Sequence, residues 1–246
     1  MSNSLFIPAA GMLAEDARAD VIANNLANVR TAGFRKDFVS FRQRLLRSGA
    51  ADVPGRSVPG LALDRTAWDR EAGPAEVTGR PLDLALQGEG WFAVRRDGRT
   101  VYTRAGDFRV NADGRLGTSD GRGEVLSTGG GPISLAGLSR VEVNGRGEFV
   151  TPDGVIASIA VVAFDDESRL EKIGDALFRD AGGAGPRAAT AVEVVPGALE
   201  QASVEPVREM TAMIAAMRAY EMNAEALRMQ DEMMGRAAND VGRLQA

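Results

Sequence analysis

The sequence predicts an α+β fold in which both ends of the chain are helical and the centre is all β. Apolar residues recur at helical spacing at both ends, whereas the centre alternates in short runs separated by turn dipeptides. With 246 residues, 44% of them hydrophobic, the chain can bury a real core. We expect a discontinuous α-helical coiled-coil domain built from both termini, 1–47 and 203–246, a linker, 48–65, and a central all-β domain, 66–202.

The first helix is predicted from an apolar stripe that contains Leu5, Ala9, Met12, Ala19, Ile22 and Leu26. This spacing indicates one amphipathic helix of about 25 residues. Pro8 falls in its first two turns, where proline is least damaging. Gly33 provides a natural stop. A second, shorter helix is predicted beyond it from the spacing of Phe34, Phe38, Phe41 and Leu45.

The last helix is predicted from about Pro206 to Leu244, with a sustained heptad seam. Its apolar positions are separated alternately by three and four residues, and seven of the nine methionines lie in this helix. Asp231 interrupts the seam, and we interpret it as a register device or an exposed end of the interface rather than a catalyst. The seam positions are Met210, Met213, Met217, Tyr220, Ala224, Leu227, Asp231, Met234, Ala238 and Val241.

The centre of the chain contains alternating runs such as WFAVRR, VYTRAG and SIAVVAF. Asp-Gly or Asn-Gly pairs at 97, 113, 120, 144 and 153 separate several of them, and such pairs are the strongest short-range hairpin signal. Residues 48–65 contain two prolines and three glycines and are therefore expected to form a flexible linker.

Composition excludes several kinds of chemistry. The chain has neither cysteine nor histidine, which rules out disulfides, thiolate or imidazole metal ligands, and catalysis by either residue. The net charge of −5 is mild, and no block is basic enough to suggest nucleic-acid binding. The start lacks the basic region of a secretory signal peptide, and no apolar run is long enough to cross a membrane. We expect no cofactor and no metal.

The remaining candidate chemistry has structural explanations. GEGWFA at 88–93 loosely imitates a dinucleotide-binding fingerprint, but a strand follows it instead of a helix. The glycines at 129–131 lack the residues of a phosphate loop. A calcium loop is not favoured either, since no twelve-residue pattern ends in glutamate. A catalytic carboxylate pair stays open but is disfavoured, because turns and a strand end account for many of the candidates, Asp107, Asp113, Asp120, Glu124, Asp153, Asp165, Asp166 and Glu167.

Three asparagines lie near the end of the first helix, in NNLANVRTAGF at 24–34. Asparagine is costly to bury without partners. Asn24 and Asn28 are one turn apart and Asn25 is adjacent, so packed amides that fix the register between helices are the favoured interpretation. Capping of the helix end by Asn28 and Thr31 is the alternative.

Neither terminal helix can bury its seam alone. The seams are therefore expected to pair with each other and then with copies of the chain, or with other proteins. The candidate subunit-interface residues are Leu5, Met12, Ile22, Asn24, Asn25, Leu26, Asn28, Gly33, Phe34, Met210, Met213, Met217, Tyr220, Leu227 and Met234.

Three stretches in order along the chain resemble the flagellar axial proteins, the rod, hook and hook-associated family. They are ANNLANVRTAGFRKDF at 23–38, RPLDLALQGEGWFAV at 80–94 and MIAAMRAYEMNAEALRMQDEMMGRA at 213–237. GALEQASVEPVREMTAMI at 197–214 and the chain length are most similar to proximal-rod members. One departure is Met217, which stands where relatives commonly have glutamine before Arg-Ala-Tyr-Glu.

The resemblance implies a structural, non-enzymatic subunit of the proximal rod of the bacterial flagellar basal body, contributing to motility. It implies export through the flagellar type III apparatus without a cleaved signal peptide. The implied partners are proximal-rod and distal-rod subunits and further copies of the chain, with the terminal helices inside and the β domain outside. The alternatives are a distal-rod or hook subunit and an enzyme that acts on the cell wall.

Overall fold

The computed structural model describes residues 6–47, 57–138, 141–174 and 176–244, which divide into two compact units. Unit 1 contains the described residues up to Ala27, those within Asp37–Asp69 and those from Glu205 onward. Unit 2 contains Asn28–Lys36 and the described residues within Arg70–Val204. Both units are therefore discontinuous in sequence, because a short segment after the first helix belongs to the second unit.

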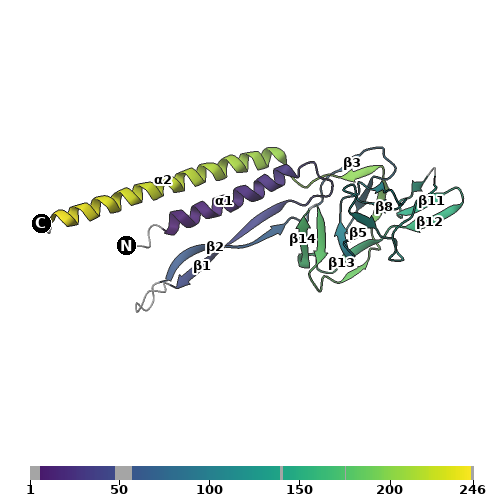
Figure 1. Ribbon diagram of the computed structural model, residues 1–246, viewed down its shortest axis with the longest axis horizontal. Helices are drawn as coiled ribbons and strands as arrows, with labels where there is room; N and C mark the ends of the chain where they lie inside the picture. The colour runs from purple at the N-terminus through teal and green to yellow at the C-terminus, as the bar shows by residue number, and fades with distance from the viewer. Residues whose placement is uncertain (1–5, 48–56, 139–140, 175, 245–246) are drawn as a thin grey trace. The chain divides into compact units, whose positions relative to one another are not determined.

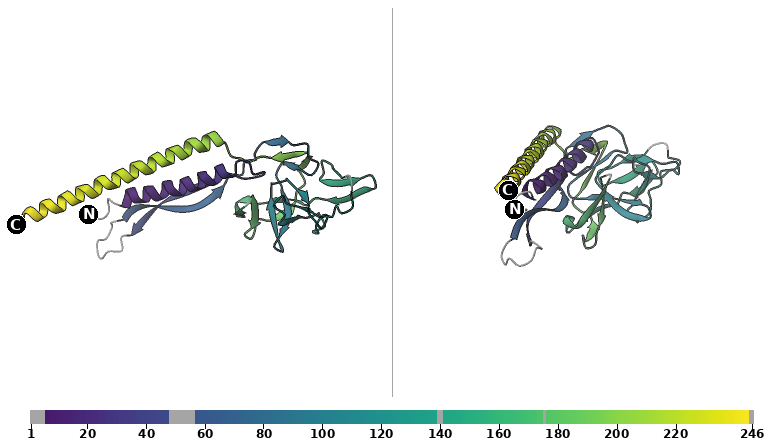
Figure 2. Two further views of the ribbon diagram at one scale, coloured as in Figure 1. Left: turned by 45° about the horizontal axis from the view of Figure 1, so that its top comes forward. Right: turned by 60° about the vertical axis from the view of Figure 1, so that its left-hand side comes forward.

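Unit 1 is built from two helices and a hairpin. Helix α1 (Phe6–Ala27) packs against helix α2 (Pro206–Leu244) on one side. On its other side α1 packs against the antiparallel hairpin of β1 (Asp37–Arg47) and β2 (Ser57–Trp68). Figures 1 and 2 show α1 lying between α2 and this hairpin. The predicted α+β class, with helical ends and a β-rich centre, is confirmed.

The predicted second helix over 34–45 is wrong, since residues 37–47 form strand β1. Part of the predicted linker is also wrong, since residues 57–65 belong to β2, while 48–56 lie outside the described residues. Phe38 and Leu45 pair with Ala67 and Pro59 across the hairpin. In a two-stranded ladder each strand has an open edge, so a proline is tolerated where its missing N–H faces away from the partner strand.

The predicted bounds of the last helix are confirmed: α2 runs from Pro206 to Leu244, 39 residues, or about 58 Å at the usual rise per residue. Pro206 occupies the first helical position, where its missing N–H has no partner within the helix to lose. The first helix is slightly shorter than predicted, with 22 residues.

Unit 2 is β-rich, and all its strand pairs are antiparallel. A 3-10 turn, η1, spans Glu167–Arg169. The strands are β3 (Ala75–Val77), β4 (Leu84–Gln87), β5 (Trp91–Arg96), β6 (Arg99–Thr103), β7 (Arg109–Val110), β8 (Leu116–Gly117), β9 (Gly123–Val125), β10 (Glu142–Val143), β11 (Glu148–Thr151), β12 (Gly154–Ser158), β13 (Val161–Phe164), β14 (Leu170–Gly174), β15 (Leu177–Asp180), β16 (Pro186–Ala188), β17 (Glu193–Pro196) and β18 (Ala198–Glu200).

Within the described residues, the largest sheet has nine strands, and its main path runs β14-β15-β6-β5-β9-β8-β7. A three-stranded sheet has the order β10-β11-β12, and the pairs β17-β4 and β18-β3 complete the unit. Each predicted Asp-Gly or Asn-Gly turn joins two strands. Asp97 and Gly98, for example, connect β5 to β6 with φ angles of 51° and 74°, the left-handed conformation that tight hairpin turns require.

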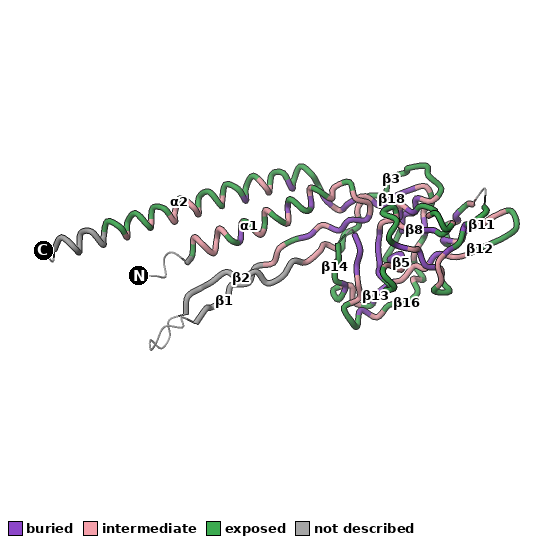
Figure 3. Tube along the Cα trace, viewed as in Figure 1, coloured by how far each residue is buried: buried purple, intermediate pink, exposed green. Residues whose placement is uncertain are grey.

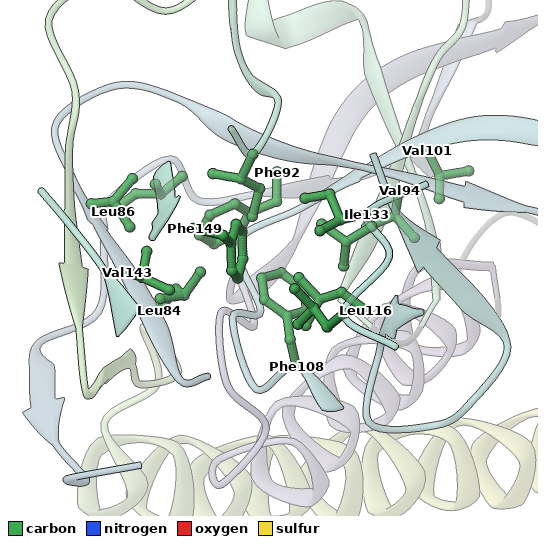
Figure 4. Close-up of a cluster of buried hydrophobic side chains, with 14 of the residues drawn as sticks. Leu84, Leu86, Phe92, Val94, Val101, Phe108, Leu116, Ile133, Val143 and Phe149 are labelled. Atoms are coloured by element: carbon green, nitrogen blue, oxygen red, sulfur yellow. The ribbon is translucent and has the colours of Figure 1, made fainter. Parts of the chain in front are cut away.

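The core of unit 2 lies between these sheets. Phe92 and Phe108 meet edge to face at 5.1 Å between ring centres, and Phe149 is fully buried. Figure 4 shows how these side chains converge with Leu84, Leu116 and Ile133. Figure 3 shows burial along the trace of unit 2: buried positions concentrate in the strands, while the β11–β12 hairpin is largely exposed.

Candidate assembly surfaces and the polar junctions that support them

Asn25 joins three elements of unit 1. Its side-chain amide donates to the Asp37 carbonyl at 2.8 Å and to Oε2 of Glu209 at 3.3 Å. Its carbonyl oxygen accepts from the Asp37 N–H at 2.8 Å. Asn25 is 1% exposed and Glu209 is 3% exposed. The amide therefore holds together the end of α1, the start of β1 and the first turn of α2.

The other two asparagines have separate roles. Asn24 donates to the Asp37 carboxylate at 2.9 Å. Asn28 accepts from the Thr31 hydroxyl at 3.2 Å, and its carbonyl accepts from the Thr31 N–H at 3.0 Å, so these two residues close the turn after α1. Partners of all three amides thus lie within the chain. Asn25 connects two helices of one subunit, and a contact of these amides with a neighbouring subunit stays a prediction.

Gly33 and Phe34, which follow this turn, are buried in unit 2. Gly33 has φ of +63°, and a Cβ there would lie 2.3 Å from the backbone of Arg104 and Ala105. Only glycine satisfies both conditions. Phe34 packs with Ala202 and Val204.

Arg35 starts a buried ionic cluster that sequence reasoning missed. Its guanidinium lies 3.0 Å from Glu200, and Arg104 approaches the same carboxylate at 3.3 Å. Both guanidinium groups lie near the Trp91 ring, at 5.8 and 5.6 Å from its centre. Burial lowers the pKa of Arg104, and the Glu200 carboxylate opposes that shift.

This cluster fixes several backbone segments of unit 2. Arg35 donates to the carbonyl of Glu71, and Arg104 donates to the carbonyl of Gly88 at 2.7 Å. The Gly33 N–H donates to the Glu200 carbonyl at 2.8 Å. Nothing local in the sequence signals these contacts, because the partners come from distant parts of the chain.

The side of α2 that packs toward α1 overlaps the predicted seam only in part. Ala216 and Glu209 are buried, and the side chain of Asn223 lies beside Gly11 of α1, where a Cβ would be 3.0 Å from it. Small residues therefore let the two helices approach closely. The half-buried positions of α2 are Ala212, Met213, Ala219, Asn223, Ala224, Ala226, Leu227, Gln230 and Met234.

Among the described side chains, four predicted seam residues are instead exposed within the subunit, namely Met210, Met217, Tyr220 and Asp231. Met210 and Met217 are 54% and 57% exposed. Together with Val207 and Ile214, also exposed, they form an apolar stripe at spacings of three and four residues along one line of the helix. We call this set the α2 stripe. A contiguous exposed apolar line of this kind marks an interaction surface.

The remaining predicted interface residues are distributed over both helices. Ile22 is buried in unit 1, Tyr220 is 38% exposed, and Leu5 lies outside the described residues. The others are half-buried, namely Met12, Leu26, Met213, Leu227 and Met234.

Several of the candidate carboxylates have structural partners. Asp165 pairs with Arg187 at 2.9 Å, and Glu167 accepts from the Trp91 indole N–H at 2.9 Å. Hydrogen bonds from Ser168 lower the pKa of Asp166. Over the residues that the structure describes, no three acidic side chains gather in a way that could hold a metal ion. No described helix combines the length and apolar character needed to cross a membrane.

An exposed apolar stripe on a long helix is typical of a subunit that assembles with other chains. Comparison with protein-family models agrees with this class. A flagella basal body rod protein model matches residues 9–35, a flagellar hook protein FlgE/F/G D1 domain model matches 85–163, and a flagellar basal body rod FlgEFG protein C-terminal model matches 195–240.

Individual relatives are similar over nearly the full chain. The flagellar basal-body rod protein FlgF of Caulobacter vibrioides is 31% identical over 246 residues, covering 99% of this chain and 100% of the relative. FlgG of the same organism is 33% identical, with 94% and 97% covered. FlgF of Salmonella typhimurium is 31% identical, with 88% and 89% covered. The chain therefore belongs to the flagellar basal-body rod protein family.

Proposed function

We propose that this chain is a structural, non-enzymatic subunit of the flagellar basal-body rod and that the α2 stripe is its contact with neighbouring subunits. The stripe is the observation that carries the proposal. It leaves four large apolar side chains open to solvent in the isolated chain, and contact with helices of adjacent subunits would cover them by coiled-coil packing. Unit 1 would then be the rod-core domain.

The proximal rod is the favoured position. The full-length correspondence with an FlgF relative over 246 residues supports it, although an FlgG relative is similarly identical. The partners in this proposal are further copies of the chain and other proximal-rod and distal-rod proteins. Export through the flagellar type III apparatus, without a cleaved signal peptide, would bring the chain to the basal body.

The test replaces Ile214 by aspartate in a strain whose only copy of the gene carries the change. Ile214 is exposed in the subunit, so the variant should fold, but a charge in a covered apolar contact costs several kcal/mol. We expect loss of motility and of incorporation into purified basal bodies.

The control is Arg228→Asp, which changes charge by two units on an exposed part of α2 beyond the stripe. This strain should swim normally. Equal motility of the two strains would contradict the assignment of the stripe.

A further inference from the structure

An apolar groove lies at one end of the large sheet of unit 2. The cavity has a volume of about 820 Å³. Phe108 and Leu135, both buried, form its floor, and Arg109, Val110 and Leu138 stand on its rim. Val110 is 45% exposed. The groove therefore offers apolar contact area with a basic side chain at its border.

The groove runs beside an open strand edge. Strand β7 is the last strand in the described sheet order, and it pairs with β8 on one side. Because the Asn111 N–H donates to the Arg115 carbonyl, alternation of the ladder directs the N–H and C=O of Val110 away from β8. Such an edge is a template for a further strand.

A complementary feature exists on the same unit. In the described sheet order, β12 ends the three-stranded sheet. The Ser158 carbonyl at the end of β12 accepts from the Thr128 N–H, and residues 154–157 form the open part of this edge. Val155 and Ile156 on this strand are 58% and 41% exposed. Asp153, in the turn that joins β11 to β12, adds a negative charge beside them. Figure 1 shows this hairpin at the border of unit 2.

We propose that the β11–β12 hairpin of one copy of the chain docks into the groove of the next copy. Strand β12 would extend the sheet at β7, and its exposed apolar pair would cover Phe108 and Val110. Asp153 would meet Arg109, so the charges of the two surfaces are complementary. The cavity volume is within the range that proteins use to enclose ligands of several apolar groups.

The contact joins two different surfaces, so it is heterologous. A heterologous contact leaves one groove and one hairpin open after every addition, and it produces an open chain of subunits unless the rotation closes a ring. This inference rests on the proposed function, because a rod subunit needs a contact that can repeat from one copy to the next. It adds a connection through unit 2 that is independent of the helices.

The absence of cysteine from the sequence makes a direct test possible, because any introduced pair is unique. The purified full-length chain carrying both Val110→Cys and Ile156→Cys is oxidised and separated without reductant. We expect a ladder of dimers, trimers and longer products. Each single variant should stay monomeric, because neither surface meets itself.

The matched control carries Val110→Cys and Ile173→Cys. Ile173 is 43% exposed on β14, which ends the main path of the same sheet opposite β7. A ladder no stronger than in this control would overturn the proposal, and so would efficient dimerisation of the single Ile156→Cys variant, which indicates a two-fold contact. Capture of a different protein by the groove with no ladder would also overturn it.

A second measurement separates this contact from the helical one. The ladder is expected to persist when Ile214→Asp is added to the double-cysteine chain, since that change lies on α2. Loss of motility from Ile214→Asp with an intact ladder supports both proposals. An absent ladder in a chain whose α2 stripe is required for motility overturns the groove contact and leaves the proposed function standing.

Discussion

The amide side chain of Asn25, which lies on α1, hydrogen-bonds the backbone of Asp37 in β1 and the carboxylate of Glu209 in α2. A leucine of similar size fits the space but cannot donate or accept. We expect Asn25→Leu to lower the free energy of unfolding of unit 1 by about 2 to 3 kcal/mol, because buried polar groups lose their partner. Urea denaturation followed by circular dichroism at 222 nm measures this change.

The neighbouring residue provides the control for that experiment. Asn24 itself is exposed, and its hydrogen bond to Asp37 is only partly buried. Asn24→Leu should therefore change stability by less than about 1 kcal/mol. Equal losses in the two variants would contradict a special role for the buried amide.

Gly33 allows a similar comparison within unit 2. Gly33→Ala combines a left-handed φ with a Cβ placed 2.3 Å from backbone atoms, and we expect a loss of about 3 kcal/mol or more. Gly79 also has a left-handed φ, +74°, but has open space around it. Gly79→Ala should cost only the strain of placing alanine at a left-handed φ, about 1 kcal/mol of unfolding free energy. Thermal unfolding of both variants tests the difference.

Among the elements, the segment 28–36 connects α1 to β1 yet belongs to unit 2. A fragment of residues 28–204 keeps Arg35 on Glu200, whereas a fragment of residues 37–204 leaves that carboxylate with Arg104 as its remaining basic neighbour in the cluster. Removing one member of a buried ionic cluster is strongly destabilising, by about 3 to 5 kcal/mol. The shorter fragment should therefore melt at a clearly lower temperature.

Differential scanning calorimetry of the two fragments measures that difference. Arg35→Met in the longer fragment is the matched variant, since it keeps the segment and removes only the guanidinium, with its charge and its hydrogen bonds. If both fragments and the variant melt together, the contacts of Arg35 contribute nothing to the stability of unit 2.

Hairpins and the long α2 helix could be predicted from sequence because their signals are local. An Asp-Gly pair defines a turn within four residues, as at Asp97. Strand β1 was missed for two reasons. Its apolar residues recur at helical spacing, and the strand that pairs with it has the proline and glycine content of a linker. The pairing became visible only in three dimensions.

The packing of the two terminal helices against each other was predicted, but several of the positions that α2 uses for it were not. Hydrophobic periodicity selects the largest apolar residues as the buried ones, yet in α2 the small Ala216 faces α1 and the larger Met217 faces solvent. Close approach of two helices favours small side chains at the contact. An analysis of hydrophobic periodicity gives such residues little weight. The Arg35 cluster had no local signal at all.

For the whole molecule, the two units should unfold separately. Among described side chains, unit 1 buries few large apolar residues, such as Ile22, whereas unit 2 has an extended apolar core. We expect two transitions when the isolated chain is heated. The helical circular-dichroism signal at 222 nm should be lost first, and the fluorescence change that reports exposure of the buried Trp91 should follow at a higher temperature.

Trp68→Phe removes the other tryptophan, so that fluorescence reports on Trp91 alone. One coincident transition by both probes would show that the units share one cooperative core.

The discontinuous division of the chain has a mechanical consequence. The backbone passes between the units at four points, after Ala27, Lys36, Asp69 and Val204. A pulling or twisting load that passes from one unit to the other is therefore shared by four covalent connections instead of one. A single break in the backbone at any one of these points leaves the other three intact, so the load path survives damage that would sever two domains joined by an ordinary linker.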